Sequence, residues 1–243
     1  MVPAAIELQA AGVRVDVPGS PEPRTILAPT TLRLTERRIG VIGANGSGKS
    51  TLARLLNGLI LPSTGRVLVD GLDTARDGAE VRRHVAFAFT DPEAQLVMPT
   101  PAEDIALSLR RLGLTRAQRT ARVADVLSRF GLAELADVSV HALSGGQKQL
   151  LALAGVLATE PDVLVCDEPT TLLDLRNTHA VARLLADLDQ QVVLVTHDLT
   201  LATQIERVLV IDGGAVVHDG PGEAAVAFYR DLVAAAVPRR EGP

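Results

Sequence analysis

Residues 43–50, with the sequence GANGSGKS, have the composition of a phosphate-binding loop. They match the pattern G-x-x-x-x-G-K-[ST], follow an apolar run and precede a helical pattern. The glycines allow backbone N–H groups to turn toward a phosphate, and the N-terminus of the following helix favours that anion. Lys49 is expected to reach the β- and γ-phosphates, and the Ser50 hydroxyl to bind Mg²⁺. The predicted nucleotide-binding residues are Gly43, Asn45, Gly46, Ser47, Gly48, Lys49, Ser50 and Thr51.

An acidic pair follows a second apolar run. Val163–Cys166 are four apolar residues, and Asp167 and Glu168 come directly after them. A buried parallel strand would bring both carboxylates to the edge of the sheet where ligands bind. Asp167 then suits the magnesium shell, and Glu168 suits a general base that orients the attacking water. A solvated loop start has the same pattern, so the pair alone leaves both interpretations open.

A third segment, Leu143-Ser144-Gly145-Gly146-Gln147, opens a predicted helix. Ser144 can cap this helix, and the glycines would leave its N-terminus accessible to an anion. An ordinary capped helix start has the same sequence pattern, so the segment alone does not establish an anion site. Ser144 lies 23 residues before Asp167. The order of phosphate loop, LSGGQ segment and acidic strand resembles that of the ATP-binding cassette (ABC) ATPases, and the resemblance covers nearly the whole chain.

This resemblance implies ATP and Mg²⁺ as cofactors and a mechanism based on a dimer. Asp174, in the segment TLLD, resembles the loop acid that communicates across the dimer, and His197, in VTHD, resembles the histidine that contacts the γ-phosphate. A lone histidine at a strand end is usually structural, so this role depends on its position after Glu168. In the family, two cassettes pack head to tail, and each ATP lies between the phosphate loop of one subunit and residues 144–147 of the other. ATP binding closes the dimer, and hydrolysis opens it.

Finer features resemble one branch of the family. The chain has a single cassette without a long coiled-coil insertion, as in detached ATPase subunits of transporters. Residues 89–97 and 103–106 resemble the energy-coupling-factor ATPases, and residues 35–43 and 144–148 resemble the biotin-importer subfamily. The resemblance implies a membrane-embedded scaffold subunit and a substrate-binding membrane subunit as partners, at the cytoplasmic face of the cell membrane. The ATPase dimer would be a homodimer or a pair with a paralogous ATPase.

Three other functions stay open at this point. The first is an ATPase for cobalt, nickel or another micronutrient importer. The second is a soluble ABC ATPase that acts on a nucleic-acid or ribosomal partner. The third is a regulatory protein that binds nucleotide without hydrolysing it, against which Glu168 argues.

The sequence departs from the family pattern in two places. Thr90 stands where the family usually has a glutamine that reaches the magnesium and the water, and Gln95 is too far along the chain to be assigned that role. No Phe, Tyr or Trp precedes Phe87, so the adenine cannot stack on an aromatic side chain near the first strands. We expect the base to lie on aliphatic or guanidinium surface, such as Val15 and Arg14.

Alternating apolar runs and 3.6-residue periodicity predict an α/β fold with a largely parallel sheet. Strands are expected at 6–9, 13–17, 38–42, 66–69, 84–89, 163–167, 192–196, 207–211 and 215–218, and a turn at 18–23. Helices are expected at 49–58, 101–112, 115–130, 145–158, 177–188 and 222–235. The resemblance to the ABC ATPases implies one ABC ATPase domain, with a P-loop NTPase (RecA-like) core, a small antiparallel β subdomain and an inserted α-helical signature subdomain. The core would comprise 1–92 and 156–243, and a helical subdomain would comprise 93–155.

Composition narrows the class of protein. The chain has 243 residues, of which 47% are hydrophobic, and a formal net charge of −5. This is a globular composition, and the negative charge argues against a nucleic-acid partner held by bulk charge. No apolar run reaches the roughly 18 residues of a membrane span, and the N-terminus does not resemble a secretory signal, so a cytoplasmic location is expected. The single cysteine, Cys166, is expected to be a buried packing residue.

Overall fold

A mostly parallel sheet forms the centre of the computed structural model, which describes residues 3–236. Its strand order is β10-β9-β3-β8-β7-β6, and β10 alone runs antiparallel to its neighbour. Every residue of β7 and β8 is buried, and all but Asp167 and Gln191 are apolar, as expected for strands covered on both faces. The strands are β3 (Arg38–Gly43), β6 (Val85–Ala88), β7 (Val163–Asp167), β8 (Gln191–Val195), β9 (Arg207–Asp212) and β10 (Ala215–Gly220).

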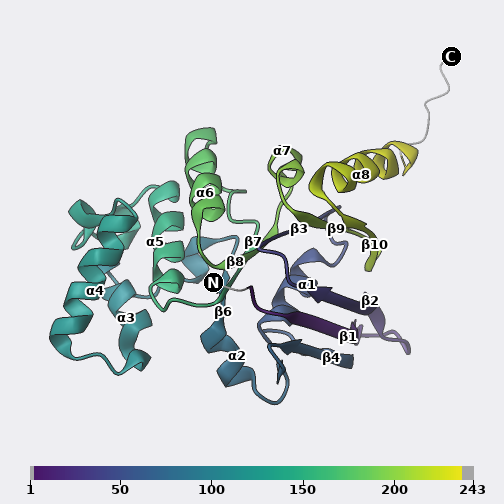
Figure 1. Cartoon of the computed structure of the whole chain (residues 1–243), viewed down its shortest axis with the longest axis horizontal. Helices are drawn as coiled ribbons and strands as arrows, with labels where there is room; N and C mark the ends of the chain where they lie inside the picture. The colour runs from purple at the N-terminus through teal and green to yellow at the C-terminus, as the bar shows by residue number, and fades with distance from the viewer. Residues whose placement is uncertain (1–2, 237–243) are drawn as a thin grey trace.

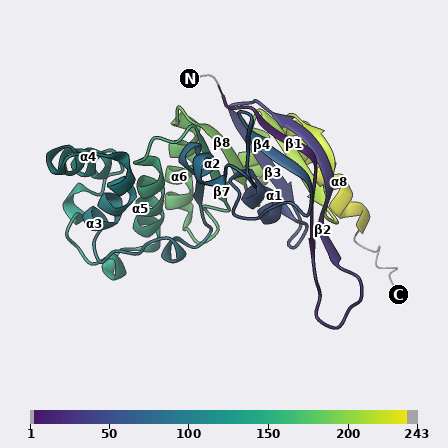
Figure 2. The same cartoon turned by 90° about the horizontal axis from the view of Figure 1, so that it is seen from below.

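A second, antiparallel sheet lies beside the first, with the order β2-β1-β4-β5 (Figure 1). It comprises β1 (Ile6–Val15), β2 (Arg24–Leu34), β4 (Thr64–Val69) and β5 (Leu72–Asp73). The expected strands 6–9 and 13–17 are in fact one strand that ends at Val15. An irregularity in the pairing separates its two halves, and Ala10 there has a left-handed φ of 49°. The strands β2 and β5 were not predicted. The expected turn at 18–23 joins β1 and β2 as a long hairpin (Figure 2).

The helices are α1 (Lys49–Leu56), α2 (Gly78–His84), α3 (Pro101–Ser108), α4 (Arg116–Arg129), α5 (Gly145–Leu157), α6 (Leu175–Asp187), α7 (Leu199–Thr203) and α8 (Gly222–Ala236). The predicted helix 101–112 ends at Ser108 and continues as a short 3-10 turn, Leu109–Leu112. The short helices α2 and α7 were not predicted. Figures 1 and 2 show α3 and α4 at the end of the molecule away from the antiparallel sheet, with α5 between them and the parallel sheet. Helix α5 runs through residue 155, where the sequence suggested a boundary.

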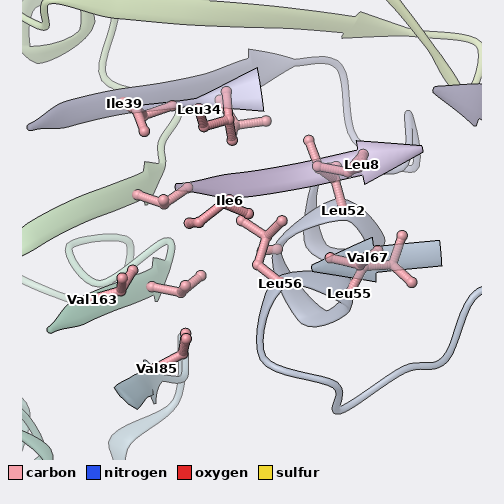
Figure 3. Packing of buried hydrophobic residues seen from close by; sticks show 14 of the residues in the cluster. Ile6, Leu8, Leu34, Ile39, Leu52, Leu55, Leu56, Val67, Val85 and Val163 are labelled. Atoms are coloured by element: carbon pink, nitrogen blue, oxygen red, sulfur yellow. The ribbon is translucent and has the colours of Figure 1, made fainter. Parts of the chain in front are cut away.

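Helix α1 is fixed between the two sheets. Leu52, Leu55 and Leu56 are fully buried and belong to the same apolar cluster as Ile6 of β1 and Val163 of β7 (Figure 3). Burial of each such leucine stabilises the fold by about 1.5–3 kcal/mol. The helix that follows the phosphate loop is therefore held rigidly against both sheets.

A second apolar cluster joins the helical segment to the parallel sheet. Ile105 of α3, Leu127 of α4 and Leu153 of α5 belong to it, together with residues of β7 and β8. Cys166 is part of this cluster, and burial raises the pKa of its thiol, in agreement with a packing role.

The described residues form a P-loop NTPase core with a small antiparallel sheet and a helical insertion, as the sequence predicted. Between residues 3 and 236, no helix combines the length and the apolar character needed to cross a membrane.

Candidate nucleotide-binding and hydrolysis site

The candidate site lies at one edge of the parallel sheet. Because β3, β6, β7 and β8 run in the same direction, their carboxyl ends meet at that edge. The residues that follow these ends are the phosphate loop after Gly43, Thr90, Glu168 and His197. The topology therefore brings together segments that are up to 154 residues apart in the sequence.

The phosphate loop connects β3 to α1 and depends on glycine for its shape. Gly48 has a φ of 107°, and a Cβ at this position would lie 2.8 Å from the backbone oxygen of Ile26 in β2. Any other residue would therefore be strained and would clash with the neighbouring sheet. Asn45 and Gly46 are exposed at the tip of the loop, and Ser47, Gly48 and Lys49 are buried below it.

The loop residues fit a phosphate group. The Lys49 Nζ donates hydrogen bonds to the backbone oxygens of Gly43 (3.0 Å) and Ala44 (2.9 Å), and burial lowers its pKa. Within residues 3–236, the buried Ser47 Oγ has no hydrogen-bond partner. A buried hydroxyl without a partner costs free energy, and an anion in the loop would satisfy it. The lysine ammonium is also already at the loop, where it can neutralise such an anion.

Oxygen atoms suited to a magnesium ion lie where the start of α1 meets the end of β7. The Ser50 hydroxyl donates to Oδ1 of Asp167 over 2.9 Å, and Nη2 of Arg54 lies 3.6 Å from Oδ2. Asp167 is 2% exposed, and this burial raises the pKa of its carboxyl group. A hydroxyl and a carboxylate are ligands that Mg²⁺ accepts, so the residues present fit this ion.

Glu168 lies beside His197 in a strained backbone conformation. Its φ is +54°, although it is not a glycine, and its backbone N–H donates to the Val195 oxygen (3.0 Å). Its Oε1 lies 2.6 Å from Nε2 of His197. The Glu168 side chain is 17% exposed and that of His197 is 41% exposed, so solvent can reach the pair.

Two threonines beside Glu168 have contacts that the sequence did not predict. The Thr171 hydroxyl donates to Oε2 of Glu168 (3.1 Å), and the Thr90 hydroxyl donates to the backbone oxygen of Asp167 (2.7 Å). For Thr171, the only available signal was its position three residues after Glu168. Thr90 is 77 residues from Asp167 in the sequence, so its contact had no local signal. The Gln95 side chain accepts a hydrogen bond from the Phe89 N–H and donates one to the Ala152 backbone oxygen, so both ends of its amide have backbone partners.

The LSGGQ segment forms the N-terminus of α5. Ser144 and Gln147 make a capping box, in which the Ser144 Oγ accepts from the Gln147 N–H and the Gln147 side chain accepts from the Ser144 N–H. The Ser-x-x-Gln spacing is a sequence signal for this motif. Gly145 and Gly146 begin the helix, and a Cβ on Gly146 would lie 2.4 Å from the side chain of Asn177.

Asp174 caps α6 by accepting a hydrogen bond from the Asn177 N–H (2.8 Å), and the side chain of Asn177 is the group that lies against Gly146. Among residues 3–236, no hydrogen bond joins residues 144–147 to the phosphate loop. The predicted site residues therefore form two groups. One contains the phosphate loop, Asp167, Glu168 and His197, and the other contains Ser144, Gly145, Gly146, Gln147 and Asp174.

Several proteins are similar in sequence to this chain over most of its length. A putative ABC transporter ATP-binding protein of Deinococcus radiodurans is 52% identical over 86% of this chain and 92% of its own length. The biotin transport ATP-binding protein BioM of Rhizobium etli is 48% identical over 94% of this chain and 99% of its own. The energy-coupling factor transporter ATP-binding protein EcfA1 of Halalkalibacterium halodurans is 41% identical over 83% of this chain and 74% of its own.

Solved structures agree with these relatives. The CbiO1 protein of Clostridium perfringens, part of the ABC transporter complex cbiONQ, superposes with a TM-score of 0.79 at 28% identity, over 97% of this chain and 95% of that protein. A dimeric ATP-binding cassette in a post-hydrolysis state, bound to ADP and Pi, superposes with a TM-score of 0.78 at 28% identity, over 89% of this chain and 98% of that one. The family model described as ABC transporter matches residues 31–171. The chain therefore belongs to the ABC transporter family and is one of its ATP-hydrolysing ATP-binding proteins.

Proposed function

We propose that this chain is the ATPase subunit of an energy-coupling-factor importer for a vitamin, and that the vitamin is biotin. The observation that carries this proposal is the similarity to the biotin transport protein BioM, which extends over 94% of this chain and 99% of that protein. The similarity to EcfA1 supports the class of importer. The alignment spans nearly all of both sequences, which supports the same activity for this chain.

We propose that the phosphate loop binds the triphosphate of ATP. Gly43, Asn45, Gly46, Ser47, Gly48 and Thr51 would surround the phosphates with backbone N–H groups and hydroxyls, and Lys49 would move its ammonium from the loop carbonyls to the β- and γ-phosphates. Ser50 and Asp167 would hold Mg²⁺. The bound ion would neutralise charge on the phosphates as the terminal bond breaks.

We propose that Glu168 is the general base. Its carboxylate would accept a proton from the water that attacks the γ-phosphate, and His197 would hold the carboxylate and contact that phosphate. The left-handed backbone at Glu168 supports this role, because strained conformations of non-glycine residues are concentrated at functional sites.

We further propose that two cassettes complete each ATP site head to tail. Ser144, Gly145, Gly146 and Gln147 would contact the ATP held by the phosphate loop of the other subunit, and Asp174 would lie at the contact between the subunits. The grouping of the site residues supports this arrangement, because the LSGGQ segment and the phosphate loop of one chain are not joined to each other. A helical subdomain, predicted at residues 93–155, would move relative to a core of residues 1–92 and 156–243. Because α5 continues to Leu157, the hinge on that side would lie after Leu157.

The partners would be a membrane-embedded scaffold subunit and a substrate-binding membrane subunit, contacted at the cytoplasmic face of the membrane. The test is uptake of radiolabelled biotin by cells that lack this chain. We expect uptake to return when the wild-type chain is expressed, and not when Glu168→Gln is expressed at the same level. Restored uptake of Co²⁺ or Ni²⁺ without biotin would instead assign the chain to a metal-ion importer. Co-purification with nucleic acid in place of membrane subunits would contradict the proposed class.

A further inference from the structure

The carboxylate of Glu168 has a separate partner at each oxygen. His197 Nε2 lies 2.6 Å from Oε1, and the Thr171 hydroxyl donates to Oε2 over 3.1 Å. A carboxylate with one partner can still rotate about its last torsion, which has a broad energy profile, whereas two partners fix its plane. Thr171 therefore restrains a degree of freedom that His197 alone leaves open.

The backbone from Glu168 to Thr171 is compact. Glu168 has a φ of +54°. A turn follows it, in which the Thr171 N–H donates a hydrogen bond to the Glu168 backbone oxygen (3.3 Å). This turn folds the Thr171 side chain back toward the carboxylate. Thr171 itself is exposed to solvent, so packing does not explain why its hydroxyl points to Glu168.

We infer that Thr171 is a positioning residue for hydrolysis. Its hydroxyl and the His197 ring together fix the plane of the Glu168 carboxylate, so that the carboxylate stays oriented toward the water that it deprotonates. The inference rests on the proposed role of Glu168 as the general base. Misplacement of a catalytic group by a fraction of an ångström slows the chemical step while it leaves ATP binding unchanged.

The test compares three substitutions under steady-state conditions with Mg²⁺ and ATP. Thr171→Val removes the hydroxyl and keeps the shape of the side chain, and Thr171→Ser keeps the hydroxyl. We expect Thr171→Val to lower kcat about tenfold, since a hydrogen bond to a charged group is lost, with KM changed less than about twofold. Thr171→Ser should restore kcat to within about twofold of the wild type. The matched control is Thr178→Val on α6, which also replaces a threonine hydroxyl by a methyl group and should keep the wild-type kcat.

ATP affinity is measured separately in the Glu168→Gln background, where hydrolysis does not disturb the binding equilibrium. Thr171→Val should not change this affinity. A wild-type kcat for Thr171→Val, or equal losses in the valine and serine variants, would overturn the inference. The proposed function fails in a different way: if Glu168→Gln hydrolyses ATP at the wild-type rate, Glu168 is not the base, and Thr171 has no base to position.

Discussion

The Ser50 hydroxyl of α1 and Oδ1 of Asp167 at the end of β7 lie 2.9 Å apart, although 117 residues separate them in the sequence. The contact exists because α1 packs in the apolar cluster that also contains Val163 and Val165 of β7. Both proposed magnesium ligands are therefore in place before the ion binds. The cost of this arrangement is the burial of the Asp167 carboxylate.

The first prediction concerns this buried carboxylate. Burial raises the pKa of Asp167, so the ionised form destabilises the fold, and this loss grows as the pH rises through the raised pKa. Asp167→Asn, which resembles the neutral acid, should therefore raise Tm at pH 7 and lower ATP hydrolysis at least about hundredfold. The difference in Tm should shrink as the pH falls and protonates the wild-type carboxyl. A lower Tm for Asp167→Asn at pH 7 would contradict this account.

The second prediction uses the scarcity of lysine in the chain. Lys49 and Lys148 are the only lysines of the sequence. Lys49→Ala should weaken ATP binding about tenfold or more, because the charge at the β- and γ-phosphates is lost. Lys148→Ala is the control, since Lys148 pairs with Glu93 and should leave the affinity of the isolated subunit unchanged. Equal ATP affinities for the wild type and Lys49→Ala, measured by calorimetry, would refute the assignment.

The third prediction concerns the base of the nucleotide. Strand β2 lies against the phosphate loop, since a Cβ on Gly48 would clash with the backbone oxygen of Ile26, and the hairpin of β1 and β2 carries no Phe, Tyr or Trp. The five Phe and Tyr residues lie on β6, just after β6, at the end of α4 and on α8. Without a stacking partner, the site should discriminate weakly between purines, and GTP should compete with ATP within about tenfold of the affinity of ATP. An affinity for GTP more than about a hundredfold below that for ATP would contradict this prediction, because other contacts would then have to recognise the adenine base.

The fourth prediction concerns Thr90. Its hydroxyl bonds to the backbone of Asp167 and not to another side chain, so it supports the loop without entering the chemistry. Thr90→Ala should reduce hydrolysis by the isolated subunit only slightly, by less than about tenfold, as expected for one neutral hydrogen bond. Thr90→Gln should raise hydrolysis or change its dependence on the membrane partner. A hundredfold loss in Thr90→Ala would show that this hydroxyl is catalytic.

Much of the parallel sheet was predictable, because β3, β7, β8 and β9 are short, apolar and bounded by turn residues. Strand β2 was missed because Pro29 and the threonines of this strand break the apolar alternation. The strand forms because it pairs with β1, which a local pattern does not show. The helices α2 and α7, with 7 and 5 residues, are too short to show a helical period.

The candidate site was also only partly predictable from the sequence. Local motifs identified the phosphate loop and the acidic pair, because spacing along the chain determines their shape. The left-handed φ of Glu168 and the Thr171 hydrogen bond were not predictable, because they depend on how a turn and the end of β8 meet in space.

The measurement that tests the central claim most directly is ATP hydrolysis by purified Glu168→Gln with Mg²⁺, combined with its oligomeric state. The amide keeps the shape of the side chain but cannot accept the proton of the water. We predict that this variant binds ATP, hydrolyses it at least about hundredfold more slowly than the wild type, and forms a stable ATP-bound dimer. Hydrolysis at the wild-type rate would contradict the account, because the proton would then go to another group.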